Sequence, residues 1–181
     1  MVADSIAKQL SLHEASVPVF IRALDNLSAI LEKGRAFADE QGIAHSELLD
    51  ARLIEDMDPL PTQVQRACDA AKLAVTRLAQ LQPVPMEDKE QSFDELQARI
   101  AATIAVLERA PADAMDGREN AEIELKTPNR TLVFTGRDYL LDFAMPNFFF
   151  HVTMAYALLR MKGVPVGKLD YLGATLQKQM A

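Results

Sequence analysis

Four polar side chains fall at positions that apolar residues usually occupy in predicted helices. His13 and His151 lie on the apolar faces of two different segments, Asn147 lies one turn before His151, and Asp56 lies on the stripe of a short helix. If these helices face one centre, the four groups meet there. A buried polar group without a partner costs about 1–3 kcal/mol, so each should bond another group, the backbone or water. These four residues therefore form the candidate pocket.

Three interpretations of this pocket are open. Two imidazoles and a carboxylate can hold a divalent first-row metal that keeps open coordination positions. A small molecule can instead lie in an apolar slot and bond to Asn147 and His151. In the third interpretation the four groups form a structural network in which every polar atom is paired and no ligand fits. No catalytic motif decides among them, so whether the protein is an enzyme stays open.

Four long segments with apolar residues at alternating spacings of three and four must position these groups. They run from residues 6 to 31, 64 to 81, 93 to 107 and 140 to 161. This spacing is typical of amphipathic α-helices, and four of them predict an all-α four-helix bundle, a single domain over the 181 residues. Pro18 and Pro146 lie inside the first and last segments, where we expect kinks or a restart because proline removes a backbone donor.

Two shorter elements are predicted in the connections. Ser46 can cap a short helix with Leu49, Leu53, Asp56 and Leu60 on one face. Before the last helix, residues 122–126 and 131–135 alternate apolar and polar side chains around a Pro-Asn turn, which predicts a β-hairpin. A lone hairpin is only marginally stable, so we expect it to lie against the helices.

Composition excludes several classes of protein. The formal charge is −7, from 19 basic and 26 acidic residues, which argues against a nucleic-acid partner. Cys68 is the single cysteine, so no intrachain disulfide and no Cys-rich zinc module can form, and its alanine-rich surroundings favour a packing role. No signal-peptide core and no membrane span of ~18 apolar residues is present. We therefore expect a soluble cytoplasmic protein.

Several strings together resemble an uncharacterised bacterial family of unknown function, grouped with the DinB-like (YfiT-like) helical bundles. They are Pro18 to Leu24, Ala51 to Leu53 with Asp56-Met57, Pro128 to Arg130 with Phe134 to Gly136, Asn147-Phe148 through His151 to Arg160, and Gly167-Lys168. The resemblance covers nearly the whole chain. It implies a four-helix bundle with a long crossover, often assembled as a homodimer. The apolar residues Leu169, Tyr171 and Leu172, and one outward ring among Phe148 to Phe150, offer surface for such a dimer.

The resemblance also implies a possible metal site. In the wider superfamily one histidine of the second helix and an H-x-x-x-H pair of the last helix commonly bind a divalent metal. Here only His151 matches, because the position four residues later is Ala155 and the nearest second-helix counterpart is Asp56. We therefore expect a non-catalytic or uncharacterised bundle that dimerises, with a small polar pocket that can take a small molecule. The alternative is a metal-dependent enzyme of transferase or hydrolase type, using His151 and Asp56 with a further ligand such as His13.

Overall fold

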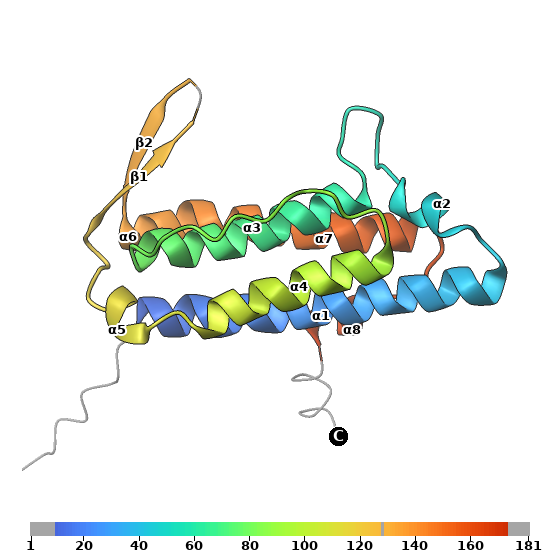
Figure 1. The fold of residues 1–181 in the computed structure, drawn as a ribbon, viewed down its shortest axis with the longest axis horizontal. Coiled ribbons are helices and arrows are strands. Elements are labelled where there is room, and N and C mark those ends of the chain that lie inside the picture. The colour runs from blue at the N-terminus through green and yellow to red at the C-terminus, as the bar shows by residue number, and fades with distance from the viewer. Residues whose placement is uncertain (1–9, 128, 174–181) are drawn as a thin grey trace, which may run out of the picture.

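Four long helices lie side by side in the computed structural model, which describes residues 10–127 and 129–173 (Figure 1). They are α1 (Leu12–Gln41), α3 (Leu60–Leu78), α4 (Phe93–Glu108) and α7 (Met145–Met161). Buried side chains from all four form one apolar core. The predicted all-α bundle is confirmed, and no helix in the described ranges is long and apolar enough to cross a membrane.

The first long helix, α1, has defined signals at both ends. Ser11 and Glu14 form a capping box at its start, in which each side chain bonds the backbone of the other. Gly42 ends it in the left-handed conformation, with φ at 63°. The helix continues through the exposed Pro18 as one element, so the restart expected there is not observed. The predicted start of this pattern, at Ile6, lies outside the described residues.

Close packing joins α7 to its neighbours on both sides. On α3, the fully buried residues Ala67, Ala71 and Ala74 allow the helix to approach closely. On α1, the Phe20 ring packs edge-on against Phe148 with 4.8 Å between centroids. Further along, a Cβ added to Gly34 would lie 3.0 Å from Leu159 Cδ2. These contacts place α1 and α7 side by side and parallel.

The short second helix is shorter than predicted. Helix α2 (His45–Leu49) stops after five residues, and residues 50–59 form a loop. A turn closes this loop, because Met57 donates its N–H to the Ile54 carbonyl at 3.0 Å and receives a bond from Arg52 at 2.5 Å. The stripe that would have carried Asp56 into the bundle therefore does not form.

The predicted β-hairpin is confirmed. Strands β1 (Glu122–Lys126) and β2 (Thr131–Thr135) pair antiparallel, with Leu125 opposite Leu132, and they follow the short helix α5 (Ala112–Met115). Figure 1 shows the hairpin projecting from one end of the bundle. Its apolar face contacts the helices through Ile123 and Leu125, which are buried.

The last long helix is wound in three sections. A short α6 (Gly136–Asp138) is capped by Thr135, a π-helical turn η1 follows (Tyr139–Ala144), and α7 then runs to Met161. Gly136 is tightly placed, since a Cβ there would overlap the carbonyl oxygen of Arg118. The chain then turns back through the short helix α8 (Lys168–Leu172), which packs on α1.

Candidate ligand-binding cavity

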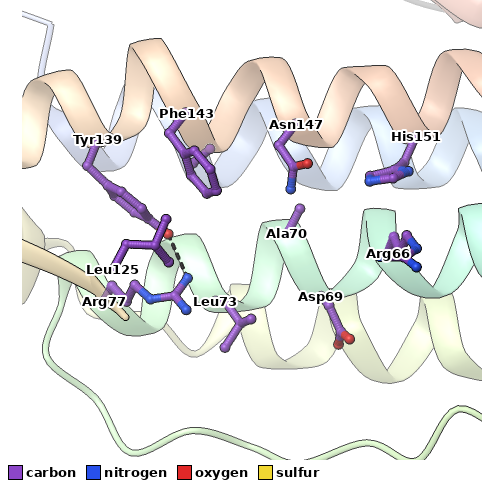
Figure 2. A pocket seen from close by; sticks show the side chains of 11 residues that line it. Arg66, Asp69, Ala70, Leu73, Arg77, Leu125, Tyr139, Phe143, Asn147 and His151 are labelled. Carbon is purple, nitrogen blue, oxygen red and sulfur yellow. Dashed lines mark hydrogen bonds between the residues drawn. The ribbon is translucent and has the colours of Figure 1, made fainter. Parts of the chain in front are cut away.

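A cavity of about 270 Å³ lies between α3 and the continuous helix formed by η1 and α7 (Figure 2). Its walls are formed by Arg66, Asp69, Ala70, Leu73 and Arg77 of α3, Leu125 of β1, and Tyr139, Phe143, Ala144, Asn147 and His151. The volume lies just below the usual range of about 300–1,000 Å³ for ligand pockets. The cavity therefore fits a small molecule, and a nucleotide-sized ligand would be too large.

Two rows of side chains build opposite walls. On α3, Arg66, Ala70, Leu73 and Arg77 follow the spacing of four, three and four residues that places side chains on one helical face. The facing wall is a row with four-residue spacing from Tyr139 through Phe143 and Asn147 to His151, as Figure 2 shows.

The π-helical turn aligns the second row. In an α-helix, residues four apart drift by about 40° around the axis, so the three such steps from Tyr139 to His151 would turn the row away from the cavity. A π turn is more loosely wound, with i→i+5 hydrogen bonds, and it turns Tyr139 and Phe143 less relative to each other. Pro146 follows directly, and its missing N–H is compatible with this change of winding.

His151 is held as a neutral imidazole. Gln63 donates from Nε2 to the Asp58 carbonyl at 3.0 Å, so its Oε1 faces His151 Nδ1 at 2.8 Å. An amide oxygen accepts, so Nδ1 must carry the proton. Burial lowers the pKa of His151, and the positive charge of Arg66 lowers it further, while Asp58 opposes this. At neutral pH, Nε2 therefore keeps a free lone pair, and no partner for it exists among the described residues.

Asn147 is the second polar group with unused capacity. Its half-buried side chain lines the cavity between Phe143 and His151 (Figure 2). Within the described ranges its amide makes no hydrogen bond to the protein, although it can donate two and accept two. The cavity wall thus presents a free amide beside a free imidazole nitrogen.

The charged groups around the cavity are paired unevenly. Arg66 pairs with Asp58 at 2.7 Å, and Asp69 is shared by Lys72 at 3.0 Å and Arg99 at 3.2 Å. Among residues 10–127 and 129–173, Arg77 bonds a single neutral group, donating from Nη1 to the Tyr139 hydroxyl at 2.9 Å. Burial raises the pKa of Tyr139, so its phenol stays protonated.

The structure brings together two of the four candidate residues from the sequence. Asn147 and His151 share the cavity, whereas Asp56 is exposed in the loop before α3. His13 lies near the start of α1, where its backbone N–H bonds Asp116 at 3.1 Å. Phe20 of α1 lies level with Phe148 of α7, because their rings are in contact. His13 precedes Phe20 and His151 follows Phe148, so a rise of about 1.5 Å per residue places the two histidines roughly 15 Å apart along the bundle. The expected meeting of all four is therefore wrong.

Sequence reasoning missed the partner of His151 and the charged wall. Gln63 is 2% exposed and lies on α3, whereas the expected counterpart of His151, Asp56, was placed on the short helix before it. The available signal was the helical spacing of Gln63, Arg66 and Arg77, which places these three polar residues on one face of α3. The prediction for this helix relied on the apolar stripe from Val64 to Leu81 and therefore did not consider that face.

The residues present do not fit the divalent metal that the resemblance implies. The residue against His151 on the second long helix is the amide Gln63, and Ala155 is fully buried one turn beyond His151. Throughout the described part of the chain, no group of three or more His, Cys, Asp or Glu is arranged to hold a metal. The Arg77 guanidinium in the wall, which has no acidic partner among the described residues, also opposes a cation by charge.

Comparisons with known proteins agree with this architecture. A crystal structure of a DinB family member protein from Shewanella denitrificans is similar, with a TM-score of 0.82 and 38% sequence identity over 90% of this chain and 92% of that chain. The fold is thus that of a DinB-like helical bundle. Residues 12–172 match DUF1993, a domain of unknown function, and the chain belongs to that family. No protein of curated function matches the sequence.

Proposed function

We propose that this protein binds a small organic molecule in the cavity between α3 and α7. The observation that carries the proposal is the pair of unused polar groups in the wall, the Asn147 amide and the His151 Nε2. Both groups belong to half-buried side chains and can bond water in the cavity, so a ligand that displaces this water can take over the hydrogen bonds. Apolar side chains, including Phe143 and Leu73, line the cavity between these groups and the charged side chains of Arg66, Asp69 and Arg77. This combination is typical of ligand pockets.

A fragment screen tests the proposal directly. Isotope-labelled protein is screened against small polar aromatic compounds, and the Asn147 side-chain amide, together with the backbone amides of α3 and α7, reports binding at the cavity. We expect a subset of compounds to shift these signals, and Asn147→Leu to weaken their binding at least tenfold. Asn120→Leu, at an exposed position, is the matched control and should change nothing. If no compound perturbs the cavity, the proposal is wrong.

The alternative is a metal-dependent enzyme that uses His151 and Asp56. Since the donor set does not fit a metal, we propose that His151 serves as a hydrogen-bond acceptor. Metal analysis of protein purified without an affinity tag distinguishes the two functions. We expect no stoichiometric metal, whereas one equivalent of zinc, nickel or iron that disappears in His151→Ala would overturn the proposal.

The cytoplasmic location of the protein stays a prediction. We further propose that the protein forms a homodimer. The segment around Leu169, Tyr171 and Leu172 offers less apolar surface than expected, because Tyr171 is half-buried. Its ring packs edge-on against the Tyr156 ring, with 5.8 Å between the centroids. Phe150 supports the dimer better: it is the outward ring of the Phe148 to Phe150 run and is 51% exposed. Sedimentation at micromolar concentration should give twice the chain mass of 20.0 kDa. Phe150→Glu should give the monomer, Val133→Glu should not, and a monomeric wild type would refute the dimer.

A further inference from the structure

The cavity holds a positive charge that the protein does not neutralise. Arg77 is half-buried, and its one hydrogen-bond partner is the phenol of Tyr139. Glu122 and Glu124 line a neighbouring hollow beside Arg77, but within the described ranges no carboxylate oxygen lies within 4.0 Å of its guanidinium. Arg66, at the other end of the cavity, has the Asp58 carboxylate. Arg77 is thus the cation in this wall without an acidic partner.

The hydrogen bond between Arg77 and Tyr139 creates a pair of converging donors. Arg77 donates to the phenol oxygen, so the phenol O–H remains free to donate elsewhere. A guanidinium has five N–H donors, and only one is used here. Figure 2 shows the guanidinium beside the Tyr139 hydroxyl on the cavity side. An anion seated between them would receive charge-assisted hydrogen bonds from both.

We propose that the ligand is a small carboxylic acid, bound with its carboxylate at the Arg77 guanidinium and the Tyr139 hydroxyl. This inference rests on the proposed function and names the ligand class of the same cavity. The apolar body of the acid lies along Phe143 and Leu73. Its far end carries a hydrogen-bond donor that the His151 Nε2 accepts, beside Asn147.

A carboxylate fits this site better than a phosphate. One uncompensated guanidinium matches one negative charge, and the planar fork of arginine suits the two oxygens of a carboxylate. A phosphate monoester carries up to two charges, and the second arginine of the cavity is already committed to Asp58. The small volume, about 270 Å³, further limits the acid to roughly one ring or an equivalent chain.

A matched set of probes tests the charge preference. The probes are 3-(4-hydroxyphenyl)propionate, the corresponding alcohol, the corresponding amine, and 4-hydroxyphenyl phosphate, each titrated by NMR into the full chain. We expect the propionate to bind at least tenfold more tightly than the alcohol and the phosphate. Added salt should weaken the binding of the propionate and leave the binding of the alcohol unchanged.

Two variants separate this inference from the proposed function. Arg77→Gln should reduce the preference for the propionate over the alcohol to about one, while the alcohol still binds. Arg109→Gln, at an exposed position on the end of α4, is the control and should keep the preference. Should Arg77→Gln fail to fold, Tyr139→Phe replaces it. We expect this variant to bind the propionate several-fold more weakly and the alcohol with unchanged affinity.

The outcomes divide cleanly. If the alcohol, the amine or the phosphate binds in the cavity as tightly as the propionate, the carboxylate inference is wrong and the proposed function stands. If a preference for the propionate survives both Arg77→Gln and Tyr139→Phe, the carboxylate lies elsewhere and the inference is again wrong. If no probe binds at millimolar concentration, both the inference and the proposed function fail.

Discussion

Two arginines in this bundle, Arg99 of α4 and Arg77 of α3, have opposite surroundings. Arg99 has a side chain that is 2% exposed, and it bonds Glu90 at 3.0 Å, Asp88 at 2.8 Å, Asp69 at 3.2 Å and the Glu87 carbonyl at 3.0 Å. Arg77 is half-buried and has one neutral partner. The first arginine is saturated by the protein itself, whereas the second retains donors that face a cavity.

The difference separates a structural cluster from a binding site. The Arg99 cluster ties the linker before α4 to α3 and α4, and it leaves only Nε without a partner. Cys68 lies beside this cluster, where burial raises the pKa of its thiol to about 11, so the thiol stays protonated and serves packing. In the cavity, by contrast, Arg77, Asn147 and the His151 Nε2 keep hydrogen-bonding capacity that the described residues do not use. Unused hydrogen-bonding groups that also face a cavity therefore indicate where a ligand is expected.

The largest predicted effect tests this contrast on stability. Arg99→Met removes one partner of a buried charge cluster and should lower the free energy of unfolding by about 2–4 kcal/mol, since the acids left behind are partly exposed and can rehydrate. Arg77→Met should lower the free energy of unfolding by about 1 kcal/mol or less, the value of one partly buried hydrogen bond between neutral and charged side chains. Urea denaturation of both variants measures the difference. Equal costs would remove the distinction between the two regions.

A smaller effect is expected at the partner of His151. Gln63→Leu leaves the Nδ1–H of His151 without its acceptor, which should cost about 1–3 kcal/mol in unfolding free energy. It also removes the bond that fixes the tautomer, so the affinity of any cavity ligand should fall as well. Gln65→Leu, on the same helix but bonded to Glu90 at 2.9 Å, is the comparison, and it should leave cavity binding intact. Unchanged binding in Gln63→Leu would contradict the role of this bond.

The smallest effect concerns pH. The folded protein lowers the pKa of His151 below its usual 6.5, so below that pH the unfolded chain binds the proton more readily. The contribution to stability is therefore complete above pH 6.5 and is lost as pH falls toward the folded pKa. His151→Gln should abolish this part of the pH dependence, while wild type becomes slightly less stable from pH 7.5 to 5. Identical pH profiles for the two proteins would show that His151 does not titrate as described.

Much of the fold could be predicted because local patterns and tertiary packing agree. The spacing of apolar residues located the four helices, the caps at Ser92 and Gly42 marked their ends, and alternation located the hairpin. Pro61 marks the first turn of α3, as expected for a proline in that position. In each case the signal lies within a few residues of sequence.

The site was predicted only in part because it depends on how helices are rotated and offset. Asn147 and His151 lie on the same helix, so their spacing alone brought them together. The meeting with His13 required the axial offset of α1 against α7, which is set by contacts such as Phe20 with Phe148. The π turn was also unforeseen, since its winding depends on the packing of Tyr139 and Phe143 against their neighbours.

The most direct test of the central claim is the nitrogen spectrum of the His151 ring. In the free protein at pH 7.5, a long-range proton–nitrogen spectrum should show a protonated Nδ1 and a bare Nε2. Saturation with 3-(4-hydroxyphenyl)propionate should move the Nε2 signal upfield, because the phenol then donates to its lone pair, and should leave Nδ1 nearly unchanged. A protonated Nε2 in the free protein would contradict the proposed binding cavity. So would ring signals that stay unchanged when the probe is bound.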